Sequence, residues 1–521
     1  MYQLMTRDEA AALIKSGDTI IFNAFGSLGF PEETAKAVGK RFAETGEPRD
    51  LDLVVNAGQG VWQPGRMIED MCQEGMLKSV MGSHLTPMLA ITRQISEGAI
   101  EGYNFSMGVM SHIYRASAGR KPGILTKIGL KTFADPRYGG GALNGRSTRK
   151  LVDLMLIDGE EYLFYRTVKP NVAILRGTTA DPRGNITMEH EATYGDIYSA
   201  ALAAKAGGGK VIVQVERLSG APAKPRDVKV PGLLVDAVVV EPGQWQTLLQ
   251  PYNPVYTGEL RIPDDQCTAH VEHIKELNIR AGRKRDRGAL HNIIARRAAM
   301  EVRDGAVVNL GIGIPEMIPK AAEEIGGATN FTLTVEAGVI GGVPSTGIDF
   351  GAGINADMLL DMALQFDFYD GGLLDMCFVG AMQIDPKGNV NVGMAGGRVI
   401  GVGGFTNITQ TARNLFYCFP FSAGGLEVAF EQGGIRLVRE GRYAKFLPKI
   451  DQINANAEYS LDIGQRVLYI TERCVFDLTP QGLRLIEIAP GISLESDILA
   501  NMPFQPQIAE HVKTMDFRLF E

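Results

Sequence analysis

The sequence predicts an α/β protein made of two related open domains with mostly parallel sheets. Three observations predict this class. Apolar, β-branched runs alternate with helix-like segments, the same motifs occur in order in both halves, and the 521 residues exceed the usual size of one hydrophobic core. We expect an N-terminal domain over residues 1–275 and a C-terminal domain over residues 285–521.

The repeated motifs are of two kinds. In residues 18–37 and again in residues 304–321, a strand-like run leads through two glycines into a helix with proline in its first turn. Further along each half, an Asp-Pro-x-Gly-Asn turn follows an apolar run, at residues 181–185 and 385–389. Two features in the same order predict two related domains.

The C-terminal end has a different pattern. Three short strand-like runs predict antiparallel strands there, at residues 467–472, 475–478 and 483–488, and the last two are joined by a turn. Ser493 is expected to cap a short helix over residues 494–499. The C-terminal domain should therefore mix parallel and antiparallel strands.

The joint between the domains is expected between about residues 262 and 288. It contains a run of charged residues at 280–287, most of them basic. In a chain of net charge −8, a solvated linker or helix face is favoured over a basic binding patch.

The composition is ordinary for a globular protein and excludes several classes. The net charge of −8 gives no basic excess for nucleic acid or an anionic membrane. No apolar run approaches the ~18 residues of a membrane span, and the first residues lack the basic start of a signal peptide. We expect a cytoplasmic protein with no nucleic-acid or membrane partner.

The five cysteines are scattered and include no CxxC pair, which fits a reducing compartment and argues against a disulfide framework. His270 and His273 are close in sequence but lack further ligands nearby, so no metal site is predicted.

Glu336 is the most informative residue. It ends a β-branched run at 331–335 and is followed by Gly338, Gly341 and Gly342, which would leave the backbone open to a large ligand. A carboxylate presented this way can act as a nucleophile. The alternative is a solvated glutamate at a strand end, and the local pattern alone favours that alternative.

Two glycine-rich segments are candidates for ligand contact. Residues 309–316 place Gly311 and Gly313 before a helix start, where N–H groups can face an anion, but neither a dinucleotide fingerprint nor a P-loop is completed. A structural tight turn explains that segment equally well. Residues 401–405 offer N–H groups that could stabilise an oxyanion, with a mobile loop as the alternative.

A third segment, residues 365–372, interleaves aromatic and acidic residues ahead of a glycine pair. Asp367 and Asp370 are candidate catalytic carboxylates there. Residues that stabilise a loop or turn are the favoured interpretation.

Together, these motifs resemble the family I coenzyme A transferases, and most closely the single-chain acetate/propionate branch with fused α-like and β-like halves. The resemblance runs from about residue 5 to about residue 505. It is carried by Glu336 with residues 337–344 and by further segments at 175–181, 309–316, 365–372, 379–389, 401–404, 423–427 and 486–491.

The resemblance implies a CoA-transferase that works by double displacement on a short-chain acyl-CoA and a carboxylic acid such as acetate. Glu336 matches the nucleophile and would carry a glutamyl-CoA thioester. The resemblance implies that Gly403 and Gly404 supply oxyanion-hole N–H groups, and that CoA, a substrate, lies against Asn309, Gly311, Gly313 and Gly401. No metal or permanent cofactor is expected. The resemblance implies that the protein forms a homodimer or homotetramer.

One position departs from the family pattern, which places Gln before Gly near the acyl site. Here residues 104–108 carry Met107 at that position, and methionine has no hydrogen-bond donor. Either Ser106, His112 or a backbone group takes over, or the acyl pocket is more apolar.

Three other functions share parts of this pattern. An acyl-CoA hydrolase would use the same Glu336 and admit water. A ligand-sensing module would not need Glu336. A nicotinamide-dependent oxidoreductase is disfavoured by the incomplete glycine fingerprint.

Overall fold

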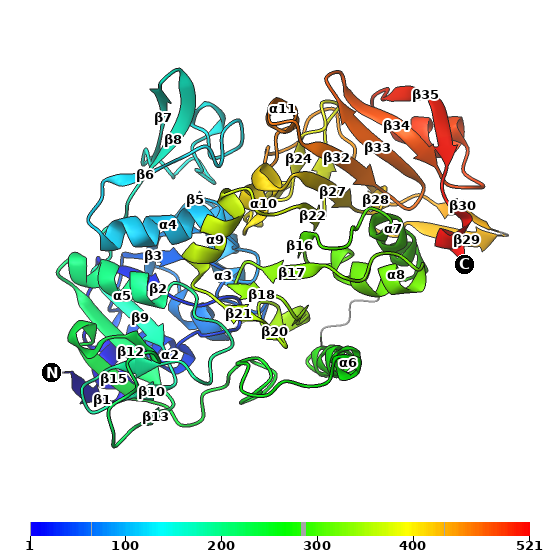
Figure 1. The fold of residues 1–521 in the computed structure, drawn as a ribbon. Coiled ribbons are helices and arrows are strands. Elements are labelled where there is room, and N and C mark those ends of the chain that lie inside the picture. Colours follow the sequence, from blue (N-terminus) through cyan, green and yellow to red (C-terminus); the bar gives the residue numbers. More distant parts are fainter. Residues whose placement is uncertain (1, 64, 283–287, 432) are drawn as a thin grey trace.

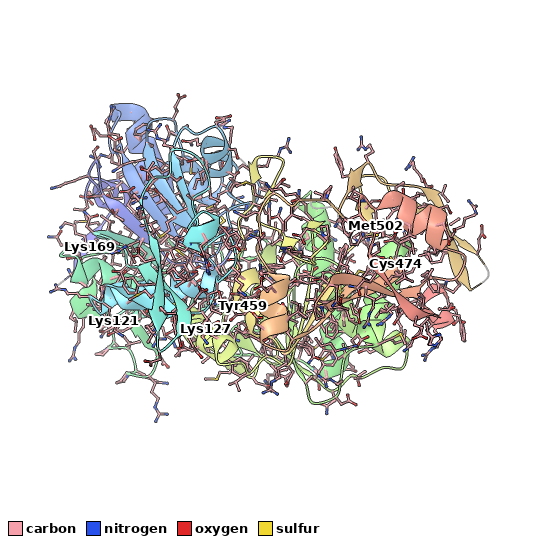
Figure 2. All side chains as sticks on the ribbon, turned by 90° about the horizontal axis from the view of Figure 1, so that it is seen from above. Lys121, Lys127, Lys169, Tyr459, Cys474 and Met502 are labelled. Carbon is pink, nitrogen blue, oxygen red and sulfur yellow. The ribbon has the colours of Figure 1, made fainter. Side chains whose placement is uncertain are left out.

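A computed structural model describes residues 2–63, 65–282, 288–431 and 433–521. Its two halves lie side by side, the N-terminal half in blue to green and the C-terminal half in green to red (Figures 1 and 2). Helices α4 (Met107–Ala118), α9 (Met362–Asp370) and α10 (Phe405–Thr411) pack together where the halves meet. A hydrophobic cluster continues through these helices from one sheet to the other.

The N-terminal half is built on an eight-stranded sheet in which all neighbouring strands are parallel. The strands in spatial order are β1 (Gln3–Met5), β15 (Ala237–Val240), β12 (Lys210–Val215), β9 (Val172–Arg176), β2 (Thr19–Phe22), β3 (Leu51–Val55), β4 (Leu77–Gly82) and β5 (Glu101–Asn104).

Helices cover both faces of this sheet, as a parallel sheet requires. One face packs against α4 and α5 (Ile197–Ala206). The opposite face packs against α1 (Arg7–Ala11), α2 (Glu32–Thr45) and α3 (Leu89–Ser96). The strands are therefore buried on both sides, and their apolar runs are continuous rather than alternating.

The C-terminal half is built on a ten-stranded sheet. Its five central strands are parallel: β17 (Thr332–Val335), β16 (Val307–Leu310), β22 (Met376–Val379), β27 (Asn414–Cys418) and β32 (Arg466–Ile470). One face packs against α7 (Ala289–Ala299) and α8 (Ile318–Glu324), and the other against α9 and α10.

Antiparallel strands extend this sheet at both edges. Beyond β17 lie β18 (Val339–Ile340) and β21 (Met358–Leu359), and beyond β32 lie β33 (Cys474–Thr479) and β34 (Gly482–Ile488). The expected antiparallel strands near the C-terminus are confirmed. The last strand, β35 (Gln507–Thr514), was not predicted, and it runs parallel to β34.

The internal repeat is confirmed at the level of topology. The strand order β3-β2-β9-β12-β15 in the first half matches β17-β16-β22-β27-β32 in the second. The two Asp-Pro-x-Gly-Asn turns also share their hydrogen bonds. Asp181 accepts from the N–H groups two and four residues on (2.8 and 2.9 Å), and Asp385 does the same (3.0 and 2.9 Å).

Of two local predictions, one needs correction and one is confirmed. Most of residues 365–372, expected as a turn-rich loop, lies in helix α9, which continues to Asp370 because Phe366 and Tyr369 are fully buried on its inner face. Ser493 does cap the following helix, through Ser496 N–H (3.3 Å). That helix is a π-helical turn, Leu494–Ile498, followed by a 3-10 turn, Leu499–Asn501.

The segment that joins the halves ends in helix α6 (Asp264–Arg280), and the predicted boundary at residue 275 falls inside this helix. The joining segment packs on the C-terminal half: the Tyr256 hydroxyl donates to Asp349 (3.0 Å), and Asn278 accepts from Ile348 N–H (2.9 Å). In the charged run expected to be a solvated linker or helix face, residues 283–287 lie outside the described residues.

Within the described parts of the chain, no helix is both long and apolar enough to cross a bilayer. All five cysteines are buried and unbridged.

Candidate active site

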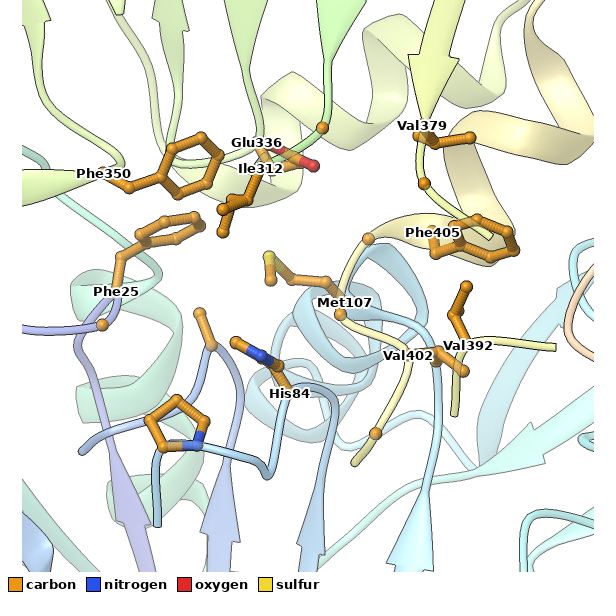
Figure 3. Close-up of a pocket in the computed structure, with 18 of the residues that line it drawn as sticks. Phe25, His84, Met107, Ile312, Glu336, Phe350, Val379, Val392, Val402 and Phe405 are labelled. Carbon is orange, nitrogen blue, oxygen red and sulfur yellow. The ribbon is translucent and has the colours of Figure 1, made fainter. Parts of the chain in front are cut away.

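A cavity of about 340 Å³ lies where the two halves meet. Figure 3 shows side chains from both halves around it. The N-terminal half contributes Phe25, Gly26, Ser27, Ala57, Gly60, Val61, Trp62, His84, Pro87 and Met107. The C-terminal half contributes Gly311, Ile312, Glu336, Gly347, Ile348, Phe350, Val379, Gly380, Ala381, Met382, Val392, Gly401, Val402, Gly403, Gly404, Phe405 and Ile408.

Glu336 enters this cavity directly after β17, so the predicted strand end is where the structure places it. The residue is 8% exposed, and its Oε2 accepts no hydrogen bond from any described residue. Burial raises the pKa of the Glu336 carboxyl above its ordinary value, although hydrogen bonds from its own N–H and from Asn309 oppose this. A poorly solvated carboxylate that faces a cavity has the character of a nucleophile.

Asn309 lies behind Glu336 rather than on the cavity wall. It is fully buried near the end of β16, and its Nδ2 donates to the Thr334 carbonyl (3.3 Å) and to the Tyr369 hydroxyl (3.4 Å). The β16–β17 pairing sets Asn309 beside Thr334, two residues before Glu336. We therefore interpret Asn309 as support for the carboxylate, whereas the sequence suggested contact with CoA.

The structure explains the glycines that follow Glu336 differently from the sequence prediction. A Cβ on Gly338 would lie 2.0 Å from the Leu360 carbonyl oxygen, and one on Gly342 would lie 2.2 Å from that of Ile354. Both have positive φ, +103° and +67°. The protein's own backbone fills the space that a ligand was expected to occupy, so these glycines allow the edge strands to pack closely.

The loop of residues 401–404 presents one unpaired N–H group beside the carboxylate. Gly401 N–H donates to Gly393 (3.0 Å), Val402 N–H to Asn104 (3.2 Å) and Gly403 N–H to Ser83 (3.1 Å). Gly404 N–H has no acceptor among the described residues. Gly403, expected as an oxyanion donor, is therefore already paired, and only Gly404 fits that expectation.

Gly404 also lies in contact with Glu336. A Cβ at Gly404 would be 3.0 Å from Glu336 Cγ and 3.4 Å from the Phe366 ring. Any side chain at this position would have to displace the carboxylate or the ring.

The other candidate residues separate into two groups. Gly311 and Gly401 line the cavity. Gly313 is not among the lining residues, and its N–H donates to the carboxylate of Glu316 (3.1 Å). The first glycine loop therefore reaches the cavity only through Gly311 and Ile312.

Asp367 and Asp370 do not line the cavity. Asp367 pairs with Arg115 (2.6 Å) and contacts His112 (2.9 Å), whereas Asp370 accepts from Asn407 Nδ2 (2.8 Å). Burial raises the pKa of Asp370 to about 6. These carboxylates support the packing of α4, α9 and α10, which is a structural role, but in a helix rather than in the loop or turn that was expected.

Apart from Met107, which the resemblance placed near the acyl site, the wall that the N-terminal half contributes was not predicted. His84 is the clearest case: it follows β4, at the carboxyl edge of a parallel sheet where ligands commonly bind. Burial lowers the pKa of His84 to about 4, so the imidazole is neutral near pH 7. The position of a histidine directly after an apolar strand is the signal that could have identified it.

The fold and the site describe an open α/β enzyme whose candidate nucleophile is a buried carboxylate. The chain belongs to the coenzyme A transferase family, because a model described as coenzyme A transferase matches residues 4–241 and 291–417. The resemblance noted in the sequence is confirmed, and the chain is a CoA-transferase.

Full-length relatives support this assignment. The chain is 39% identical to a caffeate CoA-transferase of Acetobacterium woodii, with 100% of this chain and 98% of that protein covered. It is 37% identical to the acetate CoA-transferase YdiF of Escherichia coli strain K12, with 99% and 95% covered.

The fold is that of a solved relative. The crystal structure of the apoenzyme of the acyl-CoA transferase YdiF from Escherichia coli O157:H7 matches with a TM-score of 0.91 and 36% identity, over 100% of this chain and 96% of that one. A thioester complex of YdiF with CoA matches with a TM-score of 0.90 and 35% identity, over the same shares. The predicted α/β class is confirmed.

Proposed function

We propose that this enzyme transfers CoA between a short-chain acyl-CoA and a carboxylic acid through a glutamyl-CoA thioester on Glu336. The observation that carries the proposal is the Glu336 carboxylate, buried, with an unpaired oxygen, in the cavity between the halves. Two names of relatives, acetate CoA-transferase and caffeate CoA-transferase, support carboxylic acids as the acceptor class. The YdiF complex named as a thioester with CoA supports the intermediate.

The chemistry proceeds in two half-reactions. The Glu336 carboxylate attacks the acyl-CoA carbonyl, CoA thiolate leaves, and an anhydride joins the glutamate to the acyl group. The thiolate then attacks the glutamyl carbonyl, so that the carboxylic acid leaves and the thioester remains. An acceptor carboxylate reverses both steps and departs as the new acyl-CoA.

Gly404 N–H is the group that we assign to the oxyanions formed in these steps. This N–H group is unpaired among the described residues, and Gly404 itself lies against the Glu336 side chain. Loss of one such donor typically costs about 3 kcal/mol of transition-state stabilisation. Gly311 and Gly401, both in the cavity wall, are the positions at which we expect CoA to approach the backbone. We expect the enzyme to act as a cytoplasmic homodimer or homotetramer.

The test is intact-protein mass spectrometry after incubation with butyryl-CoA and no acceptor. The parent protein should gain the mass of CoA less one water, in a form that hydroxylamine removes and a carboxylic acid converts into new acyl-CoA. Glu336→Ala should show no adduct and lose at least about 10³-fold in turnover, as expected when a nucleophile is removed. Glu323→Ala, which removes an exposed glutamate outside the cavity, is the matched control.

Release of CoA without an adduct and without need of an acceptor acid would contradict the proposal and support the hydrolase. An adduct on Glu336→Ala would show that another residue is the nucleophile.

A further inference from the structure

We propose that an exposed strand edge of the N-terminal half is the contact surface for a second copy of this chain. The edge belongs to β7 (Val152–Ile157), the outer strand of a three-stranded antiparallel sheet with β8 (Glu160–Arg166) and β6 (Gly123–Thr126). Figure 1 shows β7 and β8 standing out from the N-terminal half, above helix α4. This contact concerns assembly and does not depend on the proposed chemistry at Glu336.

Strand β7 exposes apolar side chains on both faces of its sheet. Residues 154–157 are Leu, Met, Leu and Ile, and they are 38%, 41%, 71% and 36% exposed. Because consecutive side chains of a strand point to opposite faces, neither face is covered at this end of β7. Natural edge strands usually carry lysine or proline against unwanted pairing, and β7 carries neither. Its one charge, Asp153, is paired with Arg166 of β8 (2.5 Å). An apolar edge of this kind indicates a surface that is covered in the assembled protein.

The free edge of β7 presents backbone groups that can extend the sheet. Arg166 N–H donates to the Leu151 carbonyl (2.9 Å), so the antiparallel ladder with β8 uses the odd-numbered residues of β7. The even-numbered residues, Val152, Leu154 and Leu156, therefore direct their N–H and C=O groups away from β8. No other strand of the described residues pairs with this edge. These groups are available to the edge of a further strand.

The charges at the two ends of β7 favour a second copy as the partner. Lys150 lies just before the strand and Asp158 just after it, both are exposed, and neither forms an ion pair with a described residue. When two copies of β7 pair in antiparallel fashion, the basic start of one strand lies beside the acidic end of the other. The same two-fold symmetry sets the apolar residues of one copy against those of the other. A second copy therefore matches the charge pattern and the apolar pattern together.

One register satisfies both the charges and the backbone. Hydrogen-bonded pairs between the copies must join even-numbered residues, because those residues carry the free groups. The register that sets Lys150 opposite Asp158 of the second copy meets this condition. It places Leu154 opposite Leu154 of the second copy, on the two-fold axis, with the two Cα atoms about 5.5 Å apart. The highly exposed Leu156 then lies opposite Val152 of the second copy, and the two three-stranded sheets become one continuous sheet.

Leu154→Cys tests this register, with a short bis-maleimide as the cross-linker. The five natural cysteines are buried, so the parent should give no linked product. Leu154→Cys should be linked to a second copy, because the two thiols lie next to each other on the axis. Ile157→Cys, on the same strand, is the matched control, since its two copies would lie about 20 Å apart along the strands. The proposal is overturned if Leu154→Cys is not linked, or is linked no better than Ile157→Cys.

Leu154→Lys tests whether this contact holds copies together in solution. The variant would set two ammonium groups directly opposite each other on the axis, and like charges in that position destabilise strand pairing. Sedimentation equilibrium should show the parent, of chain mass 56.4 kDa, as an oligomer and the variant at half the mass of the parent. Leu233→Lys, at an 83% exposed leucine outside this sheet, should keep the mass of the parent.

Circular dichroism of each variant shows that the chain is folded. A folded Leu154→Lys variant with the mass of the parent would overturn the proposal, and so would a monomeric parent. Formation of the Glu336 adduct, measured separately, tests the proposed function, because β7 lies outside the cavity.

Discussion

The carboxyl group of Glu336 combines two properties that are seldom found together in a glutamate: it is buried, and one of its oxygens has no hydrogen bond from a described residue. Burial favours the neutral form, so its pKa is raised. In the proposed mechanism, the ionised form of Glu336 is the nucleophile. Activity should therefore be lost as pH falls through this raised pKa, at a higher pH than for an ordinary glutamate.

We expect the acid limb of kcat/KM against pH to have an apparent pKa above 4.5, the ordinary value for this carboxyl. Asp370, with a pKa raised to about 6, titrates in the same range and supports Asn407. The profile should therefore be measured on Asp370→Asn as well. If the limb persists there, Asp370 is not its source. A limb at or below pH 4.5 would contradict the raised pKa of Glu336.

The site was predictable at the residue scale only where a local pattern carried it. Glu336 follows a β-branched run, and a strand end is a local property. The opposite wall was predictable only at Met107, which the family resemblance placed near the acyl site. Phe25 and His84 are far apart in sequence, and no local pattern brings them together with Glu336.

At the element scale, helices α4 and α10 hold the glycine loop in place through Asn407. Its Oδ1 accepts from Ser106 Oγ (2.5 Å) and Gly108 N–H (3.0 Å), and its Nδ2 donates to Asp370 (2.8 Å). Asn407 is fully buried. Removal of its amide would leave these partners buried without a hydrogen bond.

Asn407→Ala should lower the free energy of unfolding by about 1–3 kcal/mol, the usual cost of leaving buried polar groups unpaired. Denaturant unfolding measures this, with kcat recorded on the folded variant, which should fall because Gly404 is no longer fixed. Asn330→Ala, at an exposed asparagine, should alter stability by less than about 0.5 kcal/mol. Equal stability of the two variants would contradict the role given to Asn407.

The elements that the sequence failed to predict share a physical cause. Helix α9 is specified by the burial of Phe366 against α4 of the other half and of Tyr369 against β16 of its own half. Its local pattern of aromatic and acidic residues before two glycines is instead typical of a turn. Strand β35 is an edge strand of mostly exposed and half-exposed residues. Its sequence lacks the apolar run by which strands are recognised.

At the scale of the whole molecule, the cavity requires both halves. We still propose a division into two domains, with its natural place after α6 ends at Arg280. Residues 2–280 and 288–521, co-expressed as separate chains, should assemble into an active transferase, because the contacts around Asp349, Ile348 and Asn407 do not need a continuous chain.

Co-purification and CoA transfer measure this result, with each half expressed alone as the control. Neither half alone should form the Glu336 adduct from acyl-CoA. An active C-terminal half on its own would contradict the shared site.

The matching strand orders of the two halves suggest a division of labour between duplicated units. The repeat aligns β2 with β16, and β3 pairs with β2 as β17 pairs with β16. In this alignment, Glu336 corresponds to the segment Asn56-Ala57-Gly58, which carries no carboxylate. One unit carries the candidate nucleophile, and the other contributes only wall residues to the cavity. Substitutions in the N-terminal unit can therefore reshape part of the cavity without altering the unit that carries Glu336.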